Sequence, residues 1–293
     1  MIISESQWRD AASAHARRAE QWTVPHLDRR RRAIKHPVMD FLFDYYPYSP
    51  GRLRTWHPGL GVRLEGAWSR PSLANHYTFG DDGWTVDPER ADPGRLDVTL
   101  RILRGTQSRP AQHSCFGMHE WVMVYRLDPT KLRHQHENLR VDPDVIVDTV
   151  DHVGLRCTHI DAYRFFTSDA EPLNAHIPTR ANQPDIEQPG CIHANMDLFK
   201  YAMWFQPYLS GALILDCFEL TAFAREIDMR ASPYDLAHLG YTSIRVETPE
   251  GRREYAQVQQ EVAARASDLR TALIESLTEL EFATTRVVTG TSR

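Results

Sequence analysis

Histidine and carboxylate side chains stand in two stretches of this sequence that otherwise have the composition of a protein core. HIDAYRFF carries His159 and Asp161 among aromatic residues, and CIHANMDLFKYAMWF carries His193 and Asp197 among aliphatic and aromatic ones. A buried carboxylate costs several kcal/mol unless it is paired or coordinates a cation. We therefore expect these four side chains to converge with Lys200, Glu219 and His119 on one internal polar site, which serves either acid/base chemistry or metal binding.

The second stretch predicts a helix over residues 191–207 that is apolar on nearly every side and therefore buried. His193 and Asp197 are one turn apart, and Lys200 follows Asp197 at i+3, so the three share a stripe. This stripe is interpreted either as a structural Asp197–Lys200 ion pair or as part of a catalytic site.

A further helix is predicted over residues 210–230, joined to the first by a loop short enough to make the two an antiparallel pair. It places Glu219 on an otherwise apolar face, within LILDCFEL, whereas its charged end, REIDMR, is interpreted as an ion-paired surface segment. The acid/base candidates are therefore Asp161, Asp197, Glu219 and Lys200.

A metal centre is the alternative use of the same histidines. If LRCTHIDAYRFF is a strand, His159 and Asp161 point to one face of it and offer a nitrogen and an oxygen to one ion. A second histidine, His193 or His119, would complete a face of two histidines and one carboxylate of the kind that binds iron. Glu120 follows His119 in HEWVMVYR, which is not the zinc-protease motif because Met123 replaces the second histidine. One divalent ion, iron or zinc, is the cofactor considered, with His119, Glu120, His159 and His193 as its candidate ligands.

Aromatic and polar residues near these stretches could contact a substrate. A planar base stacks on aromatic rings, and a loop before a buried helix can line the mouth of a polar site. The candidates for substrate binding are Trp121, Tyr163, Arg180, Gln188, Trp204 and Arg230.

The remaining pattern predicts the elements that must position these groups. SESQ is a capping box that opens a first helix, and a second helix is expected from Pro37 to Pro47. Further helices are expected over residues 92–105 and 112–127, and a long amphipathic one from about 249 to 281. The short strands expected are residues 155–166, together with SIRVE at 243–247.

The predicted fold is mainly α with a small β-sheet (α+β), with a buried antiparallel helix pair and a long C-terminal helix. We expect one globular domain over residues 1–293. It comprises a basic helical part (about 1–70), a core part (about 92–282) and a frayed tail (284–293). The C-terminal helix is expected to pack on the core, or alternatively to form a homodimer seam.

Charge is distributed unevenly along the chain. The net charge is −5, yet the first 70 residues hold twelve Arg or Lys against seven Asp or Glu. The run Arg29–Arg32 could contact phosphates, or it could be a solvated helix end. The four cysteines show no CxxC spacing, and neither a membrane span nor a signal peptide is predicted, so a cytoplasmic protein with reduced thiols is expected.

Several blocks of the sequence resemble a bacterial family identified as 3-methyladenine DNA glycosylases. They are KHPVMDFLFDYYP, RTWHPGLGV, HEWVMVYR, LRCTHIDAYRFF, EQPGCIHANMDLFKYA, DCFEL and DMRASPYDL, which together extend over roughly residues 35–270. The resemblance implies a hydrolase of DNA repair that flips an alkylated adenine out of DNA, holds it between aromatic rings and cleaves its N-glycosidic bond with the help of an acid. The chain has no helix-hairpin-helix turn of the glycosylase type.

Three functions follow from these observations. The first is an N-glycosidase that releases a modified purine from DNA or from a free nucleoside, with DNA held through Arg29–Arg32. The second is a metal-dependent enzyme, with non-haem iron as one option, that acts on a small polar substrate. The third is a protein that binds a small ligand without catalysis. Metal content distinguishes the metal-dependent enzyme from the N-glycosidase. Salt-sensitive binding to DNA would identify DNA, rather than a free nucleoside, as the substrate.

Overall fold

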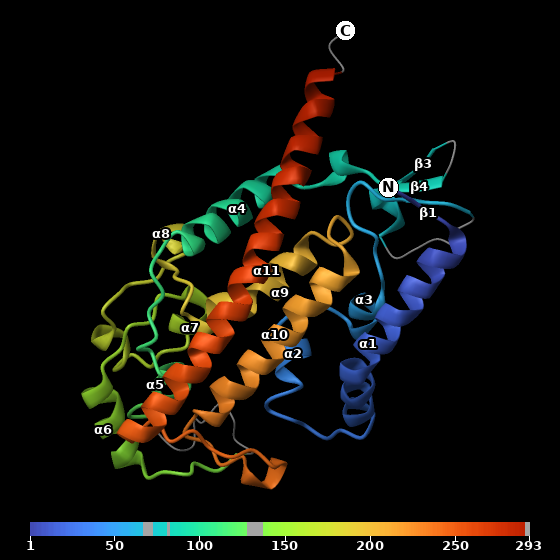
Figure 1. Ribbon diagram of the computed structural model, residues 1–293. Coiled ribbons are helices and arrows are strands. Elements are labelled where there is room, and N and C mark those ends of the chain that lie inside the picture. Colours follow the sequence, from blue (N-terminus) through green and yellow to red (C-terminus); the bar gives the residue numbers. More distant parts are fainter. Residues whose placement is uncertain (67–72, 81–82, 128–136, 291–293) are drawn as a thin grey trace. The chain divides into compact units, whose positions relative to one another are not determined.

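The computed structural model describes residues 1–66, 73–80, 83–127 and 137–290 (Figure 1). Helices account for most of these residues, and a small mixed sheet is also present, so the predicted α+β class is confirmed. The strands are β1 (Ile2–Ile3), β2 (Arg63–Leu64), β3 (Tyr77–Gly80) and β4 (Gly83–Val86). The α-helices are α1 (Glu5–Arg31), α2 (Phe41–Asp44), α3 (Pro50–Arg54), α4 (Pro93–Gln107), α5 (Met118–Val122), α6 (Pro143–Val153), α7 (Ile160–Tyr163), α8 (Gln183–Ile186), α9 (Ile192–Trp204), α10 (Gly211–Arg230) and α11 (Pro249–Gly290). Short 3-10 helices are η1 (Ala74–His76), η2 (Pro88–Arg90), η4 (Glu171–Leu173) and η5 (Ala237–Leu239).

The chain divides into two compact units. The first unit comprises Met1–Arg101, Leu198–Glu219 and Asp268–Arg293, and the second comprises Ile102–Asp197 and Leu220–Ser267. Helices α4, α9, α10 and α11 each contribute residues to both units.

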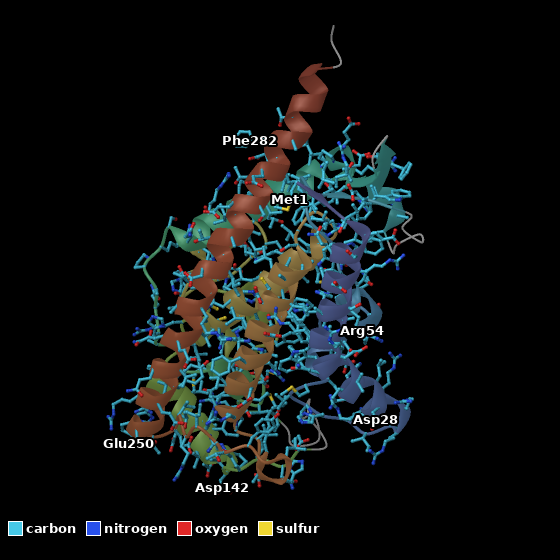
Figure 2. All side chains as sticks on the ribbon, turned by 45° about the vertical axis from the view of Figure 1, so that its right-hand side comes forward. Met1, Asp28, Arg54, Asp142, Glu250 and Phe282 are labelled. Atoms are coloured by element: carbon cyan, nitrogen blue, oxygen red, sulfur yellow. The ribbon has the colours of Figure 1, made fainter. Side chains whose placement is uncertain are left out.

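The first unit contains the sheet, whose strand order is β1-β2-β4-β3. β1 pairs in parallel with β2, and β4 pairs antiparallel with both β2 and β3 (Figure 1). The capping box of α1 is present, because Ser4 accepts from Gln7 N and Gln7 Oε1 accepts from Ser4 N. α3 is held to α1 by the ion pair of Arg54, labelled in Figure 2, with Glu20.

The predicted antiparallel helix pair corresponds to α9 and α10. In the second unit Thr221 Oγ1 of α10 donates to Met196 O of α9 at 2.9 Å. In the first unit the rings of Phe199 and Phe218 lie 5.1 Å apart. Since the later residue of α9 meets the earlier residue of α10, the two helices run in opposite directions.

The long C-terminal helix is also confirmed, and it continues to Gly290 rather than ending near 281. Both figures place the start of α11, at Glu250, near α6, which begins after Asp142 (Figures 1 and 2). The apolar stripe of α11 is buried at Tyr255, Val262, Ala266, Leu273, Leu277 and Leu280, which supports packing on the core. The homodimer seam stays a prediction.

Two predicted helices are much shorter in the structure. The helix expected from Pro37 is reduced to α2, because residues 37–40 form turns in which Asp40 accepts from the backbone N–H of His36. The helix expected over 112–127 is reduced to α5, which begins after Gly117 in the left-handed region (φ +67°). Apolar spacing alone could not reveal these turn-forming interactions.

The predicted strand over residues 155–166 is wrong. Leu155 forms one isolated bridge with Asn174, and the Asn174 side chain then bonds both the N–H and the C=O of Cys157. A side-chain amide thus takes the place of a neighbouring strand, and α7 begins directly after His159. SIRVE forms no strand either. Apart from β1, the strands of the described residues lie within residues 63–86, for which no strand was predicted.

No helix among the described residues is both long and apolar enough to cross a bilayer.

Candidate metal centre

Helix α5 carries the first two polar groups of the site into the interior of the second unit. A Cβ atom at Gly117 would lie 3.2 Å from both Ala231 Cβ and Tyr255 Cε2, and the φ of +67° also favours glycine. The turn at Gly117 therefore lets α5 begin close to its neighbours. His119 is then 10% exposed and Glu120 1% exposed in their side chains.

Two histidines and one aspartate converge in this unit. His119, His193 and Asp228 come from α5, α9 and α10, and one ligand atom of each lies within 4.8 Å of the others. Asp228 Oδ2 is 3.9 Å from both His119 Nδ1 and His193 Nε2, and the two imidazole rings are 4.5 Å apart. Two ligands of one ion with bonds of about 2.1 Å are roughly 3–3.5 Å apart, so these atoms need to approach by about half an ångström to share a metal.

Arg225 holds the carboxylates at this centre. Its Nη1 donates to Glu120 Oε1 at 2.7 Å and to Asp228 Oδ2 at 3.0 Å, and all three side chains are at most 1% exposed. The second oxygen of Asp228, Oδ1, is buried and has no hydrogen-bond partner among the described residues. Arg225 therefore fixes one edge of the Asp228 carboxylate, and Oδ1 keeps its capacity to accept.

Burial controls the protonation of the centre. Burial and the negative charge of Glu120 raise the pKa of Asp228 to about 7, although Arg225 opposes this shift. Burial, with the positive charges of His119, His159 and Arg225, lowers the pKa of His193 well below its ordinary value. His193 is therefore neutral near pH 7, which is the form that binds a metal, while Asp228 is divided between its two protonation states.

A second group of ligating side chains lies in the same unit. His159, Asp161 and Asp197 offer one atom each within 4.8 Å of one another, and all three residues are buried. His159 Nε2 is 3.2 Å from Asp197 Oδ2 and 3.5 Å from Glu187 Oε1. The rings of His159 and His193 stack at 5.7 Å with an interplanar angle of 29°. His159, Asp161, His193 and Asp197 thus lie in one unit, divided between two adjacent clusters, whereas Lys200 and Glu219, which were predicted to join them, belong to the first unit.

A small cavity borders the first group. It has a volume of about 30 Å³, which is room for one or two water molecules. His119 and His193 line it together with apolar residues, thiols and three further polar residues: Cys115, Gly117, Met118, Leu155, Arg156, Cys157, Thr158, Phe166, Gln188, Cys191 and Ile192. Burial raises the pKa of the thiol of Cys157 to about 12 and also raises those of Cys115 and Cys191, so all three stay protonated.

Five residues predicted to bind substrate lie in this unit, and four of them have contacts of a structural kind. Trp121 is fully buried and donates its indole N–H to Ala231 O at 2.8 Å. Gln188 accepts from the N–H groups of Gln112 and Gly190. Arg180 pairs with Asp161, and Arg230 donates to Thr242 O at 2.9 Å.

The other predicted site residues have different neighbours. Tyr163 of α7 packs against Phe166 with ring centroids 5.0 Å apart. In the first unit the Lys200 ammonium lies over the rings of Tyr201 and Trp204, at 5.1 and 5.8 Å. Glu219 receives two hydrogen bonds from Arg18, at 2.8 and 2.7 Å. These contacts within the first unit explain the presence of Lys200, Trp204 and Glu219 without a catalytic role.

The basic run at the end of α1 is largely ion-paired within the first unit. Arg29 pairs with Asp40 at 2.6 Å, and Arg31 and Arg32 both contact Asp28, labelled in Figure 2. Arg30 lines an open hollow of about 600 Å³ together with Lys35. Contact of this run with DNA stays a prediction.

Asp228, the carboxylate of the first group, was not predicted from the sequence. We expected REIDMR to be a surface segment, yet Arg225 and Asp228 are 1% and 0% exposed. The spacing contained a signal, since Asp228 follows Leu220 and Ala224 at steps of four and therefore continues a buried apolar stripe. Tyr255 was also missed. Its hydroxyl is buried with no hydrogen-bond partner among the described residues.

Comparisons with protein-family models, with curated proteins and with solved structures found no match to this chain. The resemblance to 3-methyladenine DNA glycosylases therefore stays a prediction from the sequence.

Proposed function

We propose that this protein is a metal-dependent enzyme whose centre is held by His119, His193 and Asp228. The observation that carries the proposal is the convergence of these three ligands, from three separate helices, to within 4.8 Å. Two histidines and one carboxylate on one face of an ion leave its other positions open, and this composition is typical of non-haem Fe(II) oxygenases. Iron is therefore the metal we expect.

The unpaired oxygen of Asp228 supports a cation at this position. A buried carboxylate oxygen without a partner is unfavourable, and here it lies beside the charge of Glu120 as well. Arg225 supplies one positive charge to the two carboxylates. A divalent ion between the two histidines and Asp228 Oδ2, which lies 3.9 Å from both, would add a second positive charge beside this carboxylate and would favour its ionised form.

The surrounding residues define what the centre could do. A bound Fe(II) would supply redox chemistry with dioxygen, and the small cavity against His119 and His193 is of a size and polarity suited to a diatomic, apolar co-substrate. Burial and nearby negative charge raise the pKa of Tyr255 well above its ordinary value, so this phenol keeps its proton and can donate it near Asp228. Arg225 acts as a positioning residue for Asp228.

The N-glycosidase predicted from the resemblance has less support from this geometry. The cavity has room for one or two waters and not for a purine base, and Trp121 is committed to a structural hydrogen bond. Base release from alkylated DNA by metal-free protein would restore that function as the better proposal.

The test is the metal content of purified, tag-free protein after anaerobic incubation with Fe(II), measured by elemental analysis. His193→Ala and Asp228→Asn are each expected to bind one iron ion fewer per chain than the unmodified protein, because each removes a ligand of this centre. The matched control is His26→Asn, which changes a buried histidine of the first unit that bonds to Asp40 at 2.9 Å. This control is expected to bind iron like the unmodified protein. Protein that binds no iron, zinc or manganese while folded, as judged by circular dichroism, would refute the proposal.

A further inference from the structure

We infer that His159, Asp161 and Asp197 hold a second divalent cation, which makes the site a two-metal centre. The inference deepens the proposed function and rests on it. The three residues are 1%, 6% and 1% exposed, and their ligand atoms lie within 4.8 Å of one another.

The spacing of this second group already suits a shared ion. His159 Nε2 lies 3.2 Å from Asp197 Oδ2 and 3.5 Å from Glu187 Oε1. Two ligands bonded to one ion at about 2.1 Å are separated by roughly 3–3.5 Å, so little movement is required. A proton on His159 Nε2 can form a strong hydrogen bond with either Asp197 or Glu187 but not with both. A divalent cation can attract both carboxylates at once.

Neighbouring side chains orient the carboxylates as the outer ligands of metal sites do. Gln183 Nε2 donates to Glu187 Oε1 at 2.7 Å, and Arg180 pairs with Asp161. Such outer hydrogen bonds fix the orientation of a ligand and are a regular feature of metal centres. Thr158 is buried next to His159, and its hydroxyl has no hydrogen-bond partner among the described residues and borders the cavity. This hydroxyl is available to a water or ligand bound at the metals.

Helix α9 connects the two groups. It supplies His193 to the first and Asp197, one turn later, to the second, and the His159 ring stacks on the His193 ring. Adjacent sites for two ions place an open coordination position of each toward shared substrate. With one imidazole and several carboxylates, the second group is richer in oxygen than the first, which favours Mn²⁺ or Fe²⁺ over softer metals.

The alternative is a protonated His159 that forms a structural ion pair with Asp197. Metal stoichiometry separates the two, with Mn²⁺ alone as the probe, measured by isothermal titration and by elemental analysis after gel filtration. We expect two ions per chain, one in Asp197→Asn, one in Asp228→Asn and none in the double variant. If Asp197→Asn does not fold, Asp161→Asn replaces it in the test. This variant is expected to lower the affinity for the second ion at least 10-fold.

One ion that is lost in Asp228→Asn and kept in Asp197→Asn would overturn the second site and leave the proposed function intact. Two ions that persist in Asp197→Asn and Asp161→Asn would also overturn the assignment. No ion in the unmodified protein would overturn the proposed function and the second site together.

Discussion

The buried histidines of the two units have different neighbours. In the first unit His15 hydrogen-bonds Leu53 O, His26 hydrogen-bonds Asp40, and His57 hydrogen-bonds the Tyr77 hydroxyl at 2.8 Å. In the second unit, His119 and His159 face the His193 ring and several carboxylates. Burial alone therefore does not indicate a functional histidine. Convergence of imidazoles with carboxylates is what distinguishes the second unit.

The charged clusters of the two units differ in the same way. Arg18 of the first unit pairs with Asp216 and Glu219 while its side chain is 36% exposed, so solvent screens the interaction. Arg225 of the second unit pairs with Glu120 and Asp228 in almost complete isolation from solvent. The second arrangement makes the protonation of Asp228 sensitive to whether another cation is bound, because burial and Glu120 already raise the pKa of this carboxyl.

The largest effect is expected from Arg225→Met in metal-free protein. The substitution removes the guanidinium that two buried carboxylates share, and breaking a buried ion pair costs about 3–5 kcal/mol. Unfolding by urea, followed by circular dichroism, measures the loss. Arg101→Met is the control, because Arg101 and Asp97 are 60% and 64% exposed, and it should cost no more than about 1 kcal/mol. Equal losses of stability in the two variants would show that the buried ion pairs of Arg225 contribute no more than an exposed ion pair does.

The next effect concerns the pH dependence of metal binding. The Asp228 carboxyl, with a pKa of about 7, must lose its proton to bind a metal, so affinity should fall by up to about tenfold for each pH unit below 7. His193 contributes little to this slope, because its pKa is already lowered. Titration with Mn²⁺ between pH 5.5 and 8 measures the effect. A flat affinity across this range would show that Asp228 is not a ligand.

The smallest effect is expected at His57, which burial keeps neutral with a pKa of about 3. Because the unfolded chain binds a proton near pH 6.5 and the folded chain does not, stability falls as pH decreases below 6.5. From pH 6.5 to 5.5 the loss attributable to His57 is about 1 kcal/mol. His57→Gln should reduce the loss by that amount in thermal unfolding. Added Mn²⁺ should leave this difference unchanged, and a metal-dependent difference would contradict a purely structural role.

Some elements followed from local chemistry that is visible in the sequence. The Ser4–Gln7 capping box begins α1, and the repeating apolar stripe of α11 extends over about seven turns, from Tyr255 to Leu280. The nearly complete apolar surroundings of His193 and Asp197 indicated a buried helix and therefore a polar site inside it. These features depend on neighbours within a few residues, so the sequence was sufficient to predict them.

Other features depend on residues far apart in the chain. Residues 155–159 look like a strand, but Asn174 satisfies the backbone of Cys157, so no partner strand is needed. REIDMR looks like an exposed, ion-paired helix end, but Glu120, which precedes it by more than a hundred residues, accepts from Arg225 in the interior. No local pattern contains that information.

The sequence by itself determined that histidines and aspartates would be buried, because apolar side chains surround them in the chain. Only the tertiary structure decided which of them share a site. In the folded chain Asp228 lies near His119 and His193, and Asp197 lies near His159. Glu219 accepts a hydrogen bond from Arg18. The physical reason is that burial follows from local composition, whereas a ligand set requires atoms from separate helices to meet within a few ångströms.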